Sequence, residues 1–341
     1  MRWTDIHLAA LGSWLPETVD ALDAVNAGLL DAERFKTLGY TSLSVGEDMA
    51  PPDMAVRAGT VALSRSGLTS RDFRVLLHGS LWYQGLDIWP TASYVAAGTV
   101  GRNVPAIDVQ QRCNVGVSAI ELAAMYLSAA GRGAAMVTTG DRFAPPAVDR
   151  WNMHEFNLYG DGGTALVLST TGGFARLLST ATVADNSLEA QTRGDEPFAV
   201  ASPARSEPVD LTARAASFAR TIDHVKVSTR IGKVMLLARN QALADAGVAM
   251  DRIARVVTPA SGRLKGDYQI HHLLGVAEEV TTWQYGRTVG HVGAGDWALG
   301  LEHLVTTRSV EPGDLVLLFG GGAGYTCSAA VLEILDLPEW T

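Results

Sequence analysis

Two stretches of the chain resemble each other: AVRAGTVALSRSGLTSRDFRVLLHGS at residues 55–80 and MLLARNQALADAGVAMDRIARVVTPA at residues 235–260. Each copy reads as an amphipathic helix that ends at a glycine, followed by a short loop and a strand. Glycine suits such a position because the residue after a helix commonly needs a positive φ. At this offset of 180 residues the identical pairs are Ala58 and Ala238, Ala62 and Ala242, Leu63 and Leu243, and Gly67 and Gly247.

The same offset holds further along the chain, where Gly133 matches Gly313 and Gly140 matches Gly320. Short apolar blocks alternate with longer helical stretches, as expected of βαβ units whose strands are covered on both faces. We therefore predict two similar α/β halves related by a pseudo-dyad, with chance similarity of two helix–strand units as the alternative. The predicted strands are Ile6–Leu11, Phe73–Leu77, Ala135–Thr138, Thr164–Leu168, Ile253–Val257 and Leu315–Phe319, and the predicted helices are Met54–Ser66, Val115–Ala130, Val234–Ala246 and Trp297–Thr307.

Composition excludes several classes of protein. Of the 341 residues 47% are hydrophobic and 18% are charged, which is too apolar for a disordered chain. Two cysteines cannot make a disulfide scaffold, and a net charge of -9 argues against a nucleic-acid binder. The sequence holds no uninterrupted run of about 18 apolar residues and no apolar leader near its start, so we expect a cytoplasmic protein with no membrane partner and reduced thiols.

Cys113 lies in VQQRCNVGVSAIELAAMYL, where a strand is expected to give way to an apolar helix. The partial positive charge of a helix N-terminus lowers the pKa of a thiol, and small residues such as Gly116 allow close backbone approach. These features favour an acyl-accepting nucleophile. The alternative is an inert buried cysteine, which is the commoner fate of a lone cysteine.

His291 and Asp296 belong to the glycine-rich sequence G-H-V-G-A-G-D at residues 290–296. Position 293 is related to Cys113 by the 180-residue offset, so a pseudo-dyad would bring this loop and Cys113 together. A histidine can then act as general base while a carboxylate fixes its tautomer and orientation. The alternatives are an ordinary loop histidine and an aspartate that only caps the helix beginning at Trp297.

The run Gly320–Gly324 follows a predicted strand and offers backbone N–H groups to an oxyanion. A tight glycine turn is an alternative, and a phosphate site is disfavoured because the Walker lysine is missing. Cys327, in an apolar context, is predicted to be core, and neither it nor His271 and His272 shows metal-ligand spacing, so we expect no metal. Trp82, Tyr83 and Trp89 are candidates to line a substrate pocket, although core packing is an equal alternative.

Three segments together resemble the ketoacyl-ACP synthase III branch of the thiolase superfamily: DVQQRCNVGVSAIELA from Asp108, LYGDGGTALVLS from Leu158 and LLFGGGAGYTCSAAVLEIL from Leu317. The G-x-W-L-P sequence at Gly12–Pro16 fits the same branch, and the order matches over essentially the whole chain. The resemblance implies a five-layered αβαβα fold of two halves, which we place at residues 1–172 and 173–341, and a homodimer.

The sequence departs from the condensing enzymes of that family at two positions. They carry histidine in P-H-Q-A-N and asparagine in G-N-T-S, whereas here Ala260 and His291 stand at those positions. The histidine and asparagine of that family donate hydrogen bonds to the malonyl thioester oxygen, and the side chain of Ala260 cannot donate. Loss of one such donor costs on the order of 10²–10³ in rate, which disfavours carbon–carbon bond formation.

The remaining Cys113, His291 and Asp296 resemble the set of the ketoacyl-ACP synthase III-like acyltransferases of antibiotic and polyketide pathways. The resemblance implies transfer of an acyl group from an acyl carrier protein (ACP) or CoA thioester to a hydroxyl, amine or carrier thiol, with no cofactor. Backbone N–H groups of Cys113 and of Gly321 or Gly322 would hold the oxyanion. A decarboxylating synthase, a non-catalytic synthase subunit and a thioester hydrolase are the alternatives.

An acidic protein that binds an acidic carrier protein needs a local basic surface. Residues 214–233 contain five basic residues and one acid, so we expect carrier docking there, with a merely solvated surface as the alternative. The docking candidates are Arg214, Arg220, Lys226 and Arg230, and Arg263 and Lys265 extend the basic character further along the chain.

Overall fold

The computed structural model describes residues 1–198, 208–267 and 272–340, and the described strands form one large sheet flanked by helices and one small sheet of two strands. Nine of these strands follow the order β5-β4-β6-β7-β1-β8-β11-β10-β9. The five on the N-terminal side are β1 (His7–Trp14), β4 (Phe73–Gly79), β5 (Ala106–Val109), β6 (Ala134–Asp141) and β7 (Gly162–Ser169). The other four are β8 (Ala175–Ala184), β9 (Ile253–Val257), β10 (Leu315–Gly322) and β11 (Thr326–Ile334).

The strand order is symmetric about the centre of the sheet, as two related halves require. Strands β1, β7, β6 and β4 follow in one direction, and β8, β11, β10 and β9 follow in the other. The halves meet where β1 pairs with β8, at His7 opposite Arg176 and Leu8 opposite Ala175. The proposed boundary at 172/173 falls in the loop between β7 and β8.

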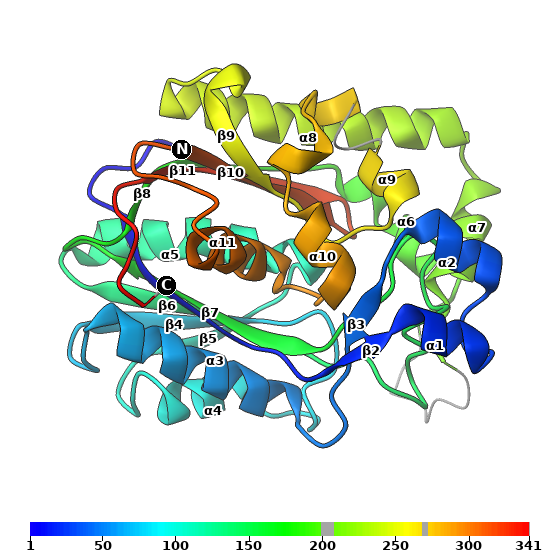
Figure 1. Ribbon diagram of the computed structural model, residues 1–341, viewed down its shortest axis with the longest axis horizontal. Helices are drawn as coiled ribbons and strands as arrows, with labels where there is room; N and C mark the ends of the chain where they lie inside the picture. The colour runs from blue at the N-terminus through cyan, green and yellow to red at the C-terminus, as the bar shows by residue number, and fades with distance from the viewer. Residues whose placement is uncertain (199–207, 268–271, 341) are drawn as a thin grey trace.

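Helices lie outside and between the two halves of the sheet (Figure 1). Helices α3 (Pro51–Ser66) and α4 (Thr91–Gly98) share an apolar core with the N-terminal strands. Helix α8 (His224–Ala246) packs in the same way on the C-terminal strands. Helices α5 (Val115–Ala130) and α11 (Asp296–Thr306) lie in the middle and share a third core with strands of both halves. This is the five-layered αβαβα fold that the family resemblance implies.

Shorter elements surround the ends of the central helices. They are β2 (Thr18–Asp20), α1 (Ala21–Asn26), α2 (Ala32–Leu38), β3 (Ser42–Ser44), α6 (Ala190–Arg193), α7 (Leu211–Ala219), α9 (Arg263–Asp267) and α10 (Trp283–Val289). The 3₁₀ turns are η1 (Arg112–Asn114), η2 (Asn186–Leu188), η3 (Met250–Arg252) and η5 (Glu278–Val280). Figure 1 places α1, α2 and α10 beyond one end of the central layer.

Local sequence explains where the repeated helices begin and end. Both α3 and α8 end at a glycine in the left-handed region, Gly67 at φ 65° and Gly247 at φ 72°. Helix α8 begins ten residues earlier than predicted because the Asp223 side chain accepts a hydrogen bond from the Val225 N–H and caps it. Strand β10 continues to Gly322, three residues beyond the predicted end, because it pairs with β11 over its whole length.

The central helix α5 is unusually apolar. Within the described residues, the stretch 112–130 is long and apolar enough to cross a bilayer by length and composition alone. Half of it is buried inside the protein, and residues such as Ile120, Ala123 and Leu127 belong to the core between the sheets. We therefore interpret α5 as a core helix.

Candidate active site

Cys113 lies in the turn η1, between the edge strand β5 and the central helix α5. The preceding residue, Arg112, has a φ of 53°, which is uncommon outside glycine and marks a sharp turn. The next residue, Asn114, is buried and binds the other half of the molecule, because its side chain donates to the Ser328 hydroxyl at 2.9 Å and accepts from the Ser328 N–H at 3.1 Å. The half-buried thiol is thus held in a fixed turn at the start of the central helix α5.

The structure brings Cys113, His291 and Asp296 into one hydrogen-bonded row. His291 Nε2 lies 3.2 Å from Cys113 Sγ, and His291 Nδ1 lies 2.6 Å from Asp296 Oδ2. His291 is 1% exposed and its backbone is fixed by hydrogen bonds to Leu158 and Gly160. Gly116 makes this approach possible, because a Cβ there would lie 2.2 Å from the Ala294 carbonyl oxygen.

Asp296 does not cap the helix that it begins. Helix α11 starts at Asp296, and its N-cap residue Gly295 makes no side-chain cap. Asp296 Oδ1 accepts from the Val292 N–H at 2.8 Å, and Oδ2 accepts from the Ala260 N–H at 2.8 Å as well as from His291. The capping alternative is therefore wrong, and the carboxylate orients the imidazole within its own loop.

The charges of its neighbours favour a protonated His291. Burial acts to lower the pKa of His291, but Asp296 and Cys113 outweigh burial and raise that pKa to about 10 from its ordinary 6.5. A cationic imidazole beside the sulfur stabilises a thiolate, which is the nucleophilic form of cysteine.

This shift gives a prediction for stability. A histidine whose folded pKa exceeds its unfolded value stabilises the fold fully below the unfolded pKa, and this contribution is lost as pH rises through the folded pKa. We expect the free energy of unfolding of the unmodified protein to exceed that of His291→Gln by the most below about pH 6.5 and by progressively less up to about pH 10. Urea unfolding of both proteins across this range measures the difference, and a constant difference would contradict the shifted pKa.

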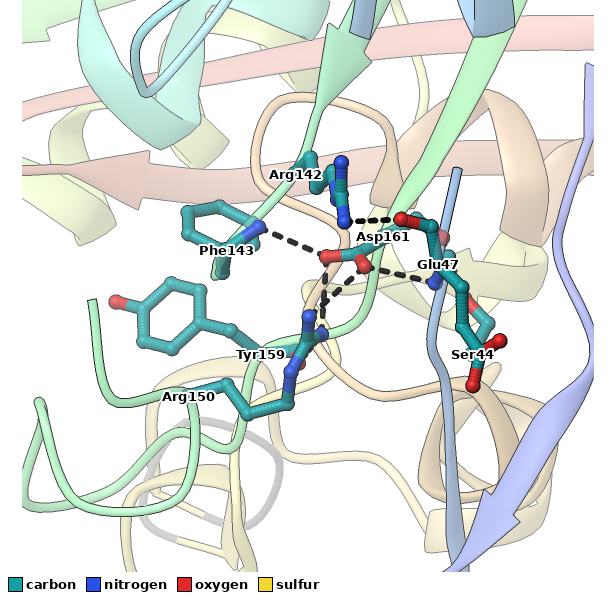
Figure 2. Close-up of polar contacts among 8 residues, drawn as sticks. Ser44, Glu47, Arg142, Phe143, Arg150, Tyr159 and Asp161 are labelled. Atoms are coloured by element: carbon teal, nitrogen blue, oxygen red, sulfur yellow. Dashed lines mark hydrogen bonds and ion pairs between the residues drawn. The ribbon is translucent and has the colours of Figure 1, made fainter. Parts of the chain in front are cut away.

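Figure 2 shows a buried ion pair between Arg150 and Asp161. Arg150 and Asp161 form two hydrogen bonds of 2.9 Å, and the carboxylate also accepts from the N–H groups of Gly46 and Phe143. Arg150 donates in addition to the Tyr159 carbonyl, and the Tyr159 ring lies 5.2 Å from the His291 ring. The pair therefore fixes the residue against which the imidazole packs.

Asp161→Asn is expected to lower the free energy of unfolding by about 3–5 kcal/mol, because it leaves the buried Arg150 cation without its counter-ion. Chemical denaturation measures this loss. Asp185→Asn is the matched control: it breaks the more exposed ion pair with Arg230 and should cost about 1 kcal/mol or less. Equal losses in the two variants would show that burial of the first pair has no energetic consequence.

The glycine and aromatic candidates are only partly gathered at this site. Gly322 lies against the turn that carries Cys113, since a Cβ there would lie 2.7 Å from the Asn114 nitrogen and 3.3 Å from the Cys113 nitrogen. Gly321 and Gly322 belong to β10 rather than to a free loop. Trp82 packs on the cluster that contains Tyr159, whereas Tyr83 is exposed and Trp89 pairs with Tyr94 on α4.

The basic segment is more nearly neutral than its sequence indicates. Arg214 pairs with Glu196, Arg220 with Asp195 and Arg230 with Asp185, all acids that lie outside residues 214–233. Lys226 is exposed and forms no ion pair within the described residues. The local excess of positive charge is therefore smaller than the sequence indicates, because the partners of the three arginines are 18–45 positions away. Carrier docking at this segment stays a prediction.

Two further charged residues, Asp141 and Lys265, lie near the site. Asp141, at the end of β6, is buried and binds the loop that carries His291. Lys265, expected on a basic surface, is half-buried; burial lowers its pKa while the charge of Cys113 acts to raise it. No spacing in the sequence distinguishes either residue from an ordinary charged one.

The other cysteine lies in the core, and only one of the two histidine candidates is described by the structure. Cys327 is fully buried in the core around α8, and burial raises the pKa of its thiol, as the core prediction expects. His271 lies outside the described residues. Among the residues that the structure describes, no group of three His, Cys, Asp or Glu side chains is placed to hold a metal ion.

Comparison with known proteins agrees with the fold and the motifs. A family model described as 3-oxoacyl-[acyl-carrier-protein (ACP)] synthase III matches residues 107–186, and its C-terminal counterpart matches residues 243–334. The mycobacterial beta-ketoacyl-[acyl-carrier-protein] synthase III of Mycobacterium tuberculosis is 24% identical over 96% of both chains.

Solved structures add a more similar relative. The structure of ChlB3, described as an acyltransferase, is 36% identical to this chain, covers 98% of it and 99% of its own length, and superposes with a TM-score of 0.94. The 3-oxoacyl-[acyl-carrier-protein] synthase III of Aquifex aeolicus, at 18% identity and a TM-score of 0.78 over 96% of this chain and 99% of its own, shares the fold. The chain therefore belongs to the ketoacyl-ACP synthase III-like enzymes of the thiolase superfamily.

Proposed function

We propose that this enzyme transfers an acyl group from an ACP or CoA thioester, through an acyl-enzyme on Cys113, to a hydroxyl, amine or carrier thiol, without decarboxylative condensation. The observation that carries the proposal is the row of contacts from Cys113 through His291 to Asp296, at 3.2 Å and 2.6 Å. A nucleophile, a base and a group that orients the base are what acyl transfer requires.

The reaction has two steps. In the resting site His291 holds the proton of the Cys113 thiol, as its raised pKa favours. The thiolate attacks the thioester carbonyl and forms the acyl-enzyme. The carbon–sulfur bond to the carrier breaks, and His291 gives the proton to the departing thiolate. The acceptor then attacks the acyl-enzyme while His291 takes its proton and returns it to Cys113. Each step passes through a tetrahedral intermediate, and backbone N–H groups of Cys113 and of Gly321 or Gly322 would stabilise its oxyanion.

Ala260 supports transfer over condensation. Its methyl group cannot donate a hydrogen bond, and its N–H already donates to Asp296 at 2.8 Å. Tyr40 donates to its carbonyl, so both polar groups of the residue have partners inside the protein. A site that stabilises a malonyl enolate with a side-chain donor at this position is therefore incomplete, whereas acyl transfer needs no such donor. The similarity to ChlB3, described as an acyltransferase, points the same way.

Two assays separate the proposal from its alternatives. With malonyl-CoA and an acylated enzyme, the proposal expects no release of carbon dioxide, and release at a rate near that of acylation would favour a decarboxylating synthase. With acetyl-CoA or benzoyl-CoA alone, release of the free acid as fast as transfer would favour a hydrolase. A non-catalytic synthase subunit would form no acyl-enzyme in either assay.

We also propose a homodimer in the cytoplasm and docking of a carrier protein. Strand β5 is an edge of the sheet with Ile107 47% exposed, and such an edge can pair with a second copy. Since Arg214, Arg220 and Arg230 are paired, carrier docking at that segment rests mainly on Lys226. Sedimentation equilibrium tests the dimer, and carrier-protein kinetics of Lys226→Glu test the docking.

A further inference from the structure

Asp141 is a buried carboxylate that the proposed mechanism does not use. It is the last residue of β6 and is 1% exposed. Its Oδ1 accepts from the N–H groups of Leu81 at 2.8 Å and Trp82 at 2.9 Å, and its Oδ2 accepts from the Ala294 N–H at 3.2 Å. One side chain thus binds the backbones of two loops that are about 210 residues apart in the sequence.

The first of these loops carries the base. Ala294 lies between His291 and Asp296, and its neighbour Gly293 has a φ of 54° with no space for a side chain, since a Cβ would lie 2.2 Å from Asp141 Oδ2. The Ala294 carbonyl packs against Gly116 at the start of α5. Asp141 therefore holds the base loop from one side while the nucleophile helix bounds it on the other.

The second loop is tied to the nucleophile turn. The Leu81 carbonyl accepts from the Arg112 guanidinium at 3.1 Å, and Arg112 directly precedes Cys113. Gln110, two residues earlier, donates to the Ser80 hydroxyl at 3.2 Å. The loop itself is secured by Gln84, whose side-chain amide donates to the carbonyls of Trp82 and Gly140.

We propose that Asp141 is a positioning residue that sets the distance between Cys113 and His291 by joining the nucleophile turn and the base loop. The inference rests on the proposed function, because it assigns the two joined segments to one reaction. In this interpretation Asp141 acts on the site through the backbone of two loops, not through direct contact with the Cys113 sulfur or the His291 imidazole. Burial raises the pKa of Asp141 to about 7, while the N–H groups of Trp82, Ala294 and Leu81 and the charge of His291 act to lower it, so the carboxylate and the imidazole influence each other.

Asp141→Asn tests this role with little change in shape. The amide oxygen is expected to keep the two N–H groups of Leu81 and Trp82, so the new NH₂ faces the Ala294 N–H, donor against donor. The repulsion then displaces the loop 290–296, which carries His291. A shift of about 1 Å in such a geometry costs on the order of 100-fold. We expect the rate of acyl-enzyme formation from acetyl-CoA or benzoyl-CoA to fall about 100-fold, with KM for the donor changed less than about threefold.

A second measurement does not depend on acyl transfer. If His291 moves away from the sulfur, alkylation of Cys113 by iodoacetamide should slow by at least about tenfold, because the thiolate loses its cationic neighbour. Asp108→Asn is the control: Asp108 also accepts a backbone N–H, from Ala92 at the start of α4, but its side chain is exposed on the edge strand β5. The control should alkylate and acylate at the rate of the unmodified protein.

The outcomes separate the inference from the proposed function. Asp141→Asn with unchanged alkylation, or with a loss matched by Asp108→Asn, would overturn the positioning role. If Cys113 is alkylated slowly in Asp141→Asn, the positioning role is supported. If the unmodified protein also never forms an acyl-enzyme, the proposed acyl transfer is refuted while the positioning role stands. If Asp141→Asn does not fold, Gly293→Ala, which crowds the same Oδ2 atom from the other side, must slow alkylation to a similar extent, or the inference fails.

Discussion

Replacing Cys113 with alanine is expected to lower acyl transfer by about 10⁴-fold or more, because the reaction then lacks its nucleophile and only binding and the oxyanion site remain. Cys113 is the cysteine that His291 reaches, at 3.2 Å. The rate of thioester loss with a nucleophilic acceptor present measures the effect. The variant should still fold, because the side chain is half-exposed in a turn that Asn114 holds through Ser328.

Cys327→Ala is the control for this result. Cys327 is fully buried among apolar side chains, and burial raises the pKa of its thiol, so it is not expected to react. Transfer by Cys327→Ala should be close to that of the unmodified protein. If the two variants lose similar activity, or if Cys113→Ala keeps more than about one hundredth of the rate, a covalent route through Cys113 is refuted.

Asp296→Asn is expected to lower kcat by about 10³–10⁴-fold, with a much smaller change in KM. The carboxylate accepts the Nδ1–H of His291, which leaves Nε2 to face the sulfur. An amide in its place can present NH₂ to the ring, and the imidazole then adopts the tautomer that cannot accept the thiol proton. In that orientation the NH₂ group also faces the Ala260 N–H, donor against donor.

Steady-state kinetics measure this effect, with whichever of acetyl-CoA and benzoyl-CoA the unmodified protein uses faster as the donor. Asp314→Asn serves as control. Asp314 also accepts a backbone N–H, from Glu311, but lies in an exposed turn before β10. A loss below about tenfold in Asp296→Asn would show that orientation of His291 by the carboxylate is not required.

The sequence predicts the fold and the three central residues because both depend on patterns that repeat. The 180-residue offset relates Cys113 to the loop 290–296, and the strand order confirms that two similar α/β halves meet at β1 and β8. Glycines mark the sites where backbones meet, and Gly116 against the Ala294 carbonyl shows why the loop and the helix can approach.

Other features depend on tertiary contacts that leave no local pattern. Strand β5 has four residues at a sheet edge, and β8 mixes Ser and Thr with apolar residues, so neither forms the continuous apolar block used to find strands. Asp141 belongs to no motif, and the LYGDGG segment that contains Asp161 does not show what its carboxylate binds; their roles come from the approach of distant N–H groups. Surface charge is equally hard to predict from sequence, because Arg214 and Arg220 pair with acids outside their own segment.

The most direct test of the account is the mass of the peptide that contains Cys113, after the protein has been incubated with acetyl-CoA or benzoyl-CoA and quenched in acid. We predict that this peptide carries the acyl group, that the group disappears when an acceptor amine or alcohol is added, and that Cys113→Ala carries none. An acyl group on any other residue, or transfer by Cys113→Ala without such an adduct, would contradict the account.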